Sequence, residues 1–144
     1  MVSCQAHATE GDAPSLWLTN GFNSYYLSQP PVNYNTSNTG FGIQFRFSGM
    51  LKNDMISAGS YHNHMYKISN YVAYDYMPIS FGNFKLGAAI GIINGLPVNN
   101  GGYAPYIVPT ASFDALGFGV NILYVPALPS VPELIAIQFK TRLF

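Results

Sequence analysis

The sequence has little charge. Asp, Glu, Lys and Arg make up only 8% of its 144 residues, whereas they make up about 25% of an ordinary soluble domain. Six basic residues balance six acidic ones, so the formal net charge is zero and the charge indicates no nucleic-acid partner. A chain with so few charges cannot cover a water-facing surface with charge in the usual way.

Long apolar runs and cysteine pairs are also missing. The chain has no run of about 18 apolar residues, which a transmembrane helix would need, and Cys4 is its only cysteine, so an intramolecular disulfide is excluded. Apolar residues nevertheless make up 49% of the chain and aromatic residues 15%. This combination is typical of a membrane β-barrel, in which each strand turns only every second residue to lipid. A soluble all-β domain such as a lipocalin-like barrel is the alternative.

Alternation of apolar and polar residues, the signature of a β-strand, recurs along the chain. In the clearest segment Phe41, Ile43, Phe45 and Phe47 alternate with small or polar residues. Segments of about ten residues have the length that crosses a bilayer at a tilt. The fold class is therefore all-β, and we expect residues 14–144 to form one eight-stranded antiparallel up-and-down β-barrel that spans a membrane. The expected strands are 16–27, 41–48, 54–62, 66–76, 84–92, 104–113, 116–124 and 135–143.

The expected connections indicate an orientation. They cover residues 28–39, 48–53, 63–65, 77–80, 94–103, 114–115 and 126–132. The first, fifth and seventh are long, and outer-membrane barrels have long outer loops and short periplasmic turns. We therefore expect the N-terminus on the periplasmic side and the odd-numbered loops on the outer side.

The charged residues of the expected strands fall on the phase opposite to the Phe and Ile residues. An eight-stranded barrel has an interior wide enough only for side chains or one slender ligand. The many large apolar side chains should therefore face outward and the charges inward. The inward charges are Arg46, Lys67, Asp75, Lys85, Lys140 and Arg142.

All of these charges except Lys67 lie toward the periplasmic end in this arrangement. The other half of the inward phase consists of small and weakly apolar residues, and its lumen-lining members include Tyr71, Ala89 and Gly91. We expect a charged floor beneath either a cavity for a hydrocarbon chain or a solid lumen of hydrogen-bonded Tyr, Asn and Gln.

Residues 1–13 precede the first expected strand and have two interpretations. Ala6, His7 and Ala8 fit the small-residue end of a signal peptide, and residues 1–4 fit the end of a lipoprotein signal. Either would make this segment a signal-peptide remnant. The alternative is an N-terminal arm without fixed structure.

Residues 104–127 contain a specific set of prolines and small residues, namely Pro105, Pro109, Ala111-Ser112, Tyr124 and Pro126. This block resembles, without a gap, the corresponding stretch of the PagP-type lipid A palmitoyltransferases. Residues 83–87 and 136–144 are also similar to strands of that family, so the resemblance covers about residues 39–144. It implies a bacterial outer-membrane barrel that transfers a palmitoyl chain from a phospholipid to lipid A. Its partners would be membrane lipid or lipopolysaccharide.

Two prolines of this block have a further meaning. Proline lacks the N–H that a strand ladder needs, and yet Pro109 lies inside an expected strand and Pro126 ends the next one. In the family such prolines open gaps through which lipids reach the lumen sideways, so the resemblance implies substrate access at Pro109 and Pro126. A bulge that only shapes the barrel is the alternative.

The catalytic residues of the family have no counterpart at the matching positions. The family has a His early in the chain and an Asp-Ser pair at the second outer loop, but no His occurs between residues 8 and 61 and the pair is absent. Ser60, His62 and His64 could rebuild an acyl-transfer centre, since residues two apart on a strand share one face. A polar loop tip is the alternative. Two His without a nearby carboxylate or Cys are a poor ligand set, so we expect no metal and no cofactor.

Three functions remain open at this point. The first is an outer-membrane acyltransferase acting on membrane lipid. The second is a non-catalytic barrel, monomeric or homo-oligomeric, that serves as a structural or self-assembling surface subunit or binds a lipid. The third is a soluble carrier with a lipocalin-like barrel.

Overall fold

The computed structural model describes residues 14–27, 36–47, 53–96, 99–127 and 133–144. These residues contain eight β-strands and one short 3₁₀ turn. The expected N-terminal arm or signal-peptide remnant at 1–13 lies outside the described residues. The 3₁₀ turn covers Asn99–Gly101. The strands are β1 (Ser15–Tyr26), β2 (Ser37–Arg46), β3 (Met55–His62), β4 (Ile68–Phe81), β5 (Phe84–Ile93), β6 (Ala104–Ala115), β7 (Phe118–Val125) and β8 (Leu134–Arg142).

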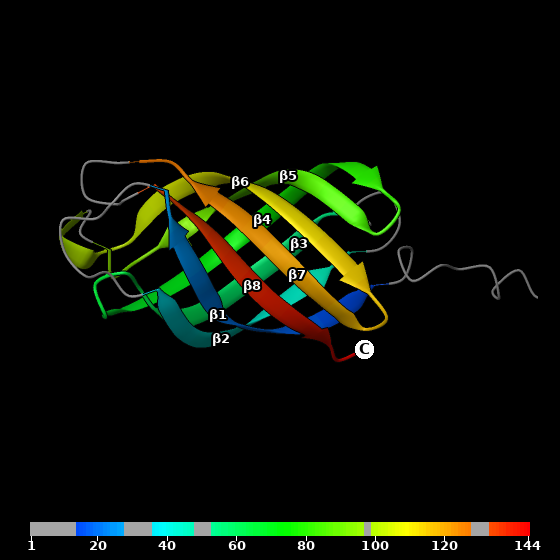
Figure 1. Ribbon diagram of the computed structural model, residues 1–144, viewed down its shortest axis with the longest axis horizontal. Coiled ribbons are helices and arrows are strands. Elements are labelled where there is room, and N and C mark those ends of the chain that lie inside the picture. The colour runs from blue at the N-terminus through cyan, green and yellow to red at the C-terminus, as the bar shows by residue number, and fades with distance from the viewer. Residues whose placement is uncertain (1–13, 28–35, 48–52, 97–98, 128–132) are drawn as a thin grey trace, which may run out of the picture.

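The strands close into a barrel in which each strand lies antiparallel to its neighbours (Figure 1). β1 completes the ring by pairing with β8, from Trp17 opposite Arg142 to Tyr26 opposite Leu134. The predicted all-β, eight-stranded antiparallel barrel is therefore confirmed. Among the described residues there is no helix with the length and apolar character of a membrane span.

The barrel has two unlike ends. At one end, which we name the turn end, lie the C-terminus and the C-terminal ends of β2, β4, β6 and β8. At the other end, the loop end, lie the C-terminal ends of β1, β3, β5 and β7. In Figure 1 the turn end is on the right and the loop end on the left.

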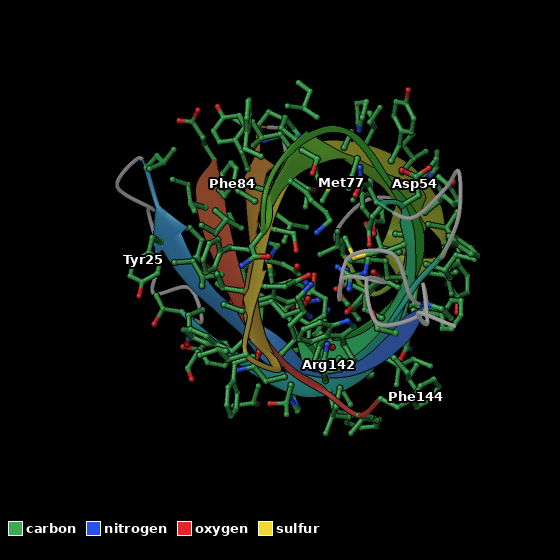
Figure 2. The ribbon with its side chains drawn as sticks, turned by 90° about the vertical axis from the view of Figure 1, so that its right-hand side faces the viewer. Tyr25, Asp54, Met77, Phe84, Arg142 and Phe144 are labelled. Carbon is green, nitrogen blue, oxygen red and sulfur yellow. The ribbon has the colours of Figure 1, made fainter. Side chains whose placement is uncertain are left out.

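Inward and outward residues alternate along the strands. On β2, for example, Arg46 is buried whereas Ile43 is exposed. Three further charges that the sequence places inside, Asp75, Lys85 and Lys140, are at most 4% exposed. Figure 2 looks at the turn end and shows side-chain nitrogen and oxygen atoms gathered inside the ring of strands.

Lys67 was predicted to face inward, and this prediction is wrong. Lys67 is exposed and precedes β4, which begins at Ile68. The chain turns at this point, because the N–H of Asn63 donates to the carbonyl oxygen of Lys67 at 2.7 Å and Tyr66 has a φ of 62°. A turn interrupts the two-residue alternation, so Lys67 does not belong to the inward face.

Strand β4 is longer than the sequence predicts. Residues 77–80 are expected as a loop, but β4 runs on to Phe81. The ladder with β5 shifts register around Pro78, and such a bulge accommodates a residue that has no N–H. The backbone N–H of Met77 leaves the ladder and donates to Asp54 Oδ1 at 2.9 Å.

The β6–β7 turn also lies beyond its predicted position. Residues 114–115 are expected as the connection, but both pair with β7. The turn is instead Leu116-Gly117, with φ values of 54° and 82°. Two successive residues with positive φ match the type I′ geometry that suits the twist of a hairpin. The expected strand start at 116 is therefore wrong, and β7 starts at Phe118.

Replacing Leu116 with asparagine should stabilise the barrel. Leucine is disfavoured at positive φ, whereas asparagine adopts this conformation more readily. Leu116 is 90% exposed, so the substitution removes almost no packing. We expect Leu116→Asn to raise the free energy of unfolding by about 0.5–1 kcal/mol. Denaturant titration followed by the fluorescence of Trp17, the only tryptophan of the chain, measures the change.

Gly117→Ala is the matched control for this substitution. The φ of Gly117 is 82°, which alanine adopts at a cost of about 1 kcal/mol, so this variant should be less stable than the original chain. A free energy of unfolding that stays the same or falls in Leu116→Asn would contradict a turn with positive φ at position 116.

Candidate functional site

The loop-end half of the lumen is hollow. It contains a cavity of about 790 Å³, which lies within the range of ligand-binding pockets. Ala73, Ala89 and Val108 form a buried apolar cluster in its wall. Of the two interiors that the sequence leaves open, the structure has the hollow one. The residues expected in the lumen, Tyr71, Ala89 and Gly91, all line the cavity.

Small inward residues on adjacent strands create this space. Ala73 of β4 lies opposite Gly91 of β5. A Cβ atom at Gly91 would come within 2.2 Å of the carbonyl oxygen of Val72, so no larger residue fits there without a shift of the backbone. Gly59 of β3 leaves room in the same way for the ring of Tyr71, whose hydroxyl would lie 2.7 Å from an added Cβ.

A layer of polar side chains forms the floor of the cavity. Gln44 Nε2 donates to Asp75 Oδ2 at 3.0 Å and to Ser57 Oγ at 3.1 Å. On the other side of the lumen, Asn121 Nδ2 donates to Gln138 Oε1 at 3.0 Å. Because these residues come from β2, β3, β4, β7 and β8, the layer joins strands across the barrel.

A cluster of ionic groups, which we name the ionic hub, lies below this layer at the turn end. Asp114 is its centre: one carboxylate oxygen lies 2.8 Å from Lys140 Nζ, and the other lies 3.4 Å from Arg46 Nη1 and 4.0 Å from Lys85 Nζ. Lys140 Nζ also donates to Gln44 Oε1 at 2.7 Å. The ionic hub and the polar layer are therefore one connected network.

The indole of Trp17 closes this network toward the turn end. The ring is 1% exposed and lies 4.9 Å from Lys140 Nζ and 6.0 Å from the guanidinium carbon of Arg142. Its N–H donates to Ser15 Oγ at 2.8 Å. A charged floor is thus present where the sequence places it. Its central carboxylate, Asp114, was missed because the predicted strand ended at residue 113, two residues before the end of β6.

Asp114→Asn should strongly destabilise the barrel. The substitution leaves Arg46, Lys85 and Lys140 buried without the carboxylate that they share, and breaking a buried ion pair costs about 3–5 kcal/mol. We expect a loss of that size in the free energy of unfolding, measured by denaturant titration with Trp17 fluorescence. Glu133→Gln is the matched control, because among the described residues the Glu133 carboxylate accepts only an exposed hydrogen bond from Tyr124. Equal denaturation midpoints for the two variants would contradict the role of the hub.

The wall of the barrel is interrupted between β6 and β7. Their ladder starts at Thr110 opposite Leu123 and covers only the turn-end half of the two strands. On the loop-end side, in the described part of the chain, residues 104–109 pair with β5 alone, and Tyr124 and Val125 pair with β8 alone. We name this interruption the β6–β7 gap.

Prolines stand at the gap, and the cavity reaches it. Pro109 is the first residue of β6 beyond the ladder, and Pro126 directly follows the end of β7. Residues on both sides of the gap line the cavity, among them Val108, Val125 and Pro126. The cavity therefore reaches the part of the wall in which β6 and β7 are not paired.

A second irregularity in the wall is closed by a side chain. The pairing of β1 with β8 shifts by one residue between Thr19 and Asn23. Asn20 Oδ1 accepts a hydrogen bond from the backbone N–H of Phe139 at 2.9 Å, and the Asn20 carbonyl accepts one from Gln138 Nε2 at 3.1 Å. The β6–β7 gap has no such bridge among the described residues.

Ser60, His62 and His64, which the sequence groups as catalytic candidates, do not share a face. Ser60 and His62 lie on the outward phase of β3, and exposed His62 Nδ1 lies 3.3 Å from Thr39 Oγ1. His64 is instead 5% exposed and lines the cavity. The expected common face is wrong because β3 ends at His62, and Asn63 then turns the chain by accepting the backbone N–H of Met65 on its Oδ1 at 2.9 Å.

Comparison with known proteins adds no assignment to this site. No protein-family model matches the sequence, and no curated protein matches it significantly. In the described ranges, no three His, Cys, Asp or Glu side chains come close enough together to hold a metal ion. The resemblance to the palmitoyltransferases stays a prediction that depends on residues 104–127.

Proposed function

We propose that this protein is an outer-membrane β-barrel that binds a hydrocarbon chain of a membrane lipid in its lumen. The observation that carries the proposal is the cavity of about 790 Å³ with an apolar wall, which is lined by residues on both sides of the β6–β7 gap. The resemblance of residues 104–127 to lipid A palmitoyltransferases supports the same class of ligand.

The outer surface supports a membrane location. Every strand presents a large apolar side chain that is between 39% and 64% exposed, while the lumen holds buried charges. A barrel in water would bury its large apolar side chains and expose its charges, whereas a barrel in lipid exposes the apolar side chains and buries the charges. The exposed residues, one from each strand in order, are Leu18, Ile43, Ile56, Val72, Ile90, Ile107, Ile122 and Phe139.

Sideways entry fits the physics of a bilayer. A lipid chain that passes from the bilayer through the β6–β7 gap stays in apolar surroundings throughout, so its transfer needs no exposure to water. A gap in lipid would normally leave backbone donors without partners. Pro109 has no N–H, which reduces the number of such donors at the edge of the ladder.

A disulfide across the β6–β7 gap should block uptake of a lipid chain. Positions 109 and 124 are the first pair beyond the ladder that ends at Thr110 and Leu123. We expect the variant Pro109→Cys, Tyr124→Cys, with Cys4→Ser to prevent mixed disulfides, to lose most of its bound palmitate when oxidised and to regain it on reduction. Native mass spectrometry of the detergent-solubilised barrel measures the bound palmitate.

Phe113→Cys with Val120→Cys is the matched control, because these residues are partners within the ladder and a disulfide there leaves the gap open. Equal palmitate binding by both oxidised variants would contradict sideways entry. The absence of palmitate binding by the original chain would contradict the proposed function itself. A barrel that stays in solution without detergent, or that assembles into regular fibres or tubes, would contradict the membrane location.

Acyl transfer is a second candidate function, and the position of His64 favours it. His64 lines the cavity and follows β3 at the loop end, which corresponds to the outer side in the orientation that we propose. A base near the mouth of a chain-binding cavity could accept the proton of an attacking hydroxyl. Ser60 and His62 face away from the cavity, so His64 alone of the three fits this role.

His64→Gln should therefore abolish acyl transfer, while His62→Gln should leave it unchanged because the His62 ring is exposed outside the lumen. Mass spectrometry of lipid A from bacteria that produce each variant measures the number of acyl chains. If production of the original chain leaves lipid A acylation unchanged, acyl transfer is contradicted, and lipid binding remains the proposal.

A further inference from the structure

We propose that the floor of the cavity contains a binding subsite for a hydroxyl group on the buried end of a hydrocarbon chain, with the carboxyl group of Asp75 as its partner. This inference rests on the proposed function, since it assumes that a chain enters the cavity. It goes further by naming the chemical class of that chain.

One oxygen of Asp75 is fully engaged by the barrel. Oδ2 accepts hydrogen bonds from Gln44 Nε2 at 3.0 Å and from Ser57 Oγ. Gln44 is itself held by Lys140, whose Nζ donates to its Oε1 at 2.7 Å. Asp75 therefore has a fixed orientation before any ligand arrives, which is the condition for a specific hydrogen bond.

The other oxygen, Oδ1, is accessible from the cavity. None of the hydrogen bonds among the described residues reaches Asp75 Oδ1, and Asp75 is only 4% exposed and lines the cavity. A purely apolar chain that covered this oxygen would leave it without any hydrogen bond, which is unfavourable. A chain that brings a hydrogen-bonding group to the floor of the cavity avoids this cost.

A hydroxyl group fits this position better than an ionic group. It can both donate and accept, so it pairs with the carboxyl group in either protonation state. It is neutral, so it can pass the apolar wall formed by Ala73, Ala89 and Val108, where a charged group would lose its hydration without compensation. Since Asp75 lies at the floor, the hydroxyl group must stand at or near the chain end that enters first.

Competition between palmitate and 16-hydroxypalmitate tests the subsite. The two probes differ by one terminal hydroxyl group and are separated by mass. We expect native mass spectrometry of the solubilised barrel with equal amounts of both probes to show about tenfold more of the hydroxylated adduct, as one hydrogen bond to a charged group would give. Asp75→Leu replaces the carboxyl group with an apolar group of similar shape. In this variant the ratio of hydroxylated to unmodified adduct should fall to one or below.

Ser57→Ala is the matched control. It removes one of the two hydrogen bonds to Oδ2 that Asp75→Leu removes but keeps Oδ1 in the cavity, so the hydroxylated probe should still be preferred. Because each ratio is measured within one sample and compared between variants, unequal partitioning of the probes into detergent cancels. The result also holds for a partly destabilised variant, since only folded barrel with bound probe is counted.

The outcomes separate the inference from the proposed function. If neither probe binds the original chain, the lipid-binding function fails and the subsite fails with it. If both probes bind equally well, the function stands and the subsite is overturned. A preference for the hydroxylated probe that persists in Asp75→Leu also overturns it, because another residue must then recognise the hydroxyl group.

Discussion

In a closed ring of antiparallel strands each residue points either into the lumen or out of the barrel, and a shift of one residue exchanges the two faces. Arg46 on β2, Lys85 on β5 and Lys140 on β8 stand on the inward phase around Asp114 on β6. A one-residue slip of any of these strands would move a charge to the outer face, among exposed Phe and Ile side chains. The ionic hub thus selects one register, whatever its net contribution to stability.

The filled half and the hollow half of the lumen depend on each other. At the turn end, Trp17, Met55 and Met77 are at most 1% exposed, and the ionic hub and polar layer occupy the adjoining space. At the loop end, small inward residues such as Ala73, Ala89 and Gly91 leave a cavity, and a cavity forfeits packing contacts. Strand register and stability must therefore come mainly from the filled half, which leaves the hollow half free to hold a ligand.

The sequence predicts the number of strands and their faces because alternation requires only the type of each residue. It places strand ends less well, because these depend on contacts made in the folded barrel. Residues 77–80 are expected as a loop, but a bulge and the contact between Met77 and Asp54 keep them in β4. Asp114 reads as a turn residue, and only its pairing with β7 turns it into the lumen.

The candidate site could be predicted in part for the same reason. Small inward residues such as Ala89 and Gly91 indicate a space without any knowledge of register. The orientation of the Asp75 carboxyl group could not be predicted. It depends on the strand register that places Gln44 and Ser57 within hydrogen-bond distance of Oδ2. His64 could not be placed either, since the turn that buries it starts with hydrogen bonds of Asn63 that alternation does not describe.

The two interruptions of the wall differ in how well they suit the proposed passage of a lipid chain. At β1 the ladder shifts, yet Asn20 supplies a side-chain acceptor for the N–H of Phe139, so the wall remains hydrogen-bonded. At β6 the ladder ends beside Pro109, a residue that has no N–H to satisfy. An irregularity that only shaped the barrel would be expected to have its backbone donors satisfied by a side chain, as Asn20 does at β1. The second interruption stays unpaired, borders the cavity and leaves fewer unmatched donors in lipid, and these properties suit the proposed sideways passage of a lipid chain.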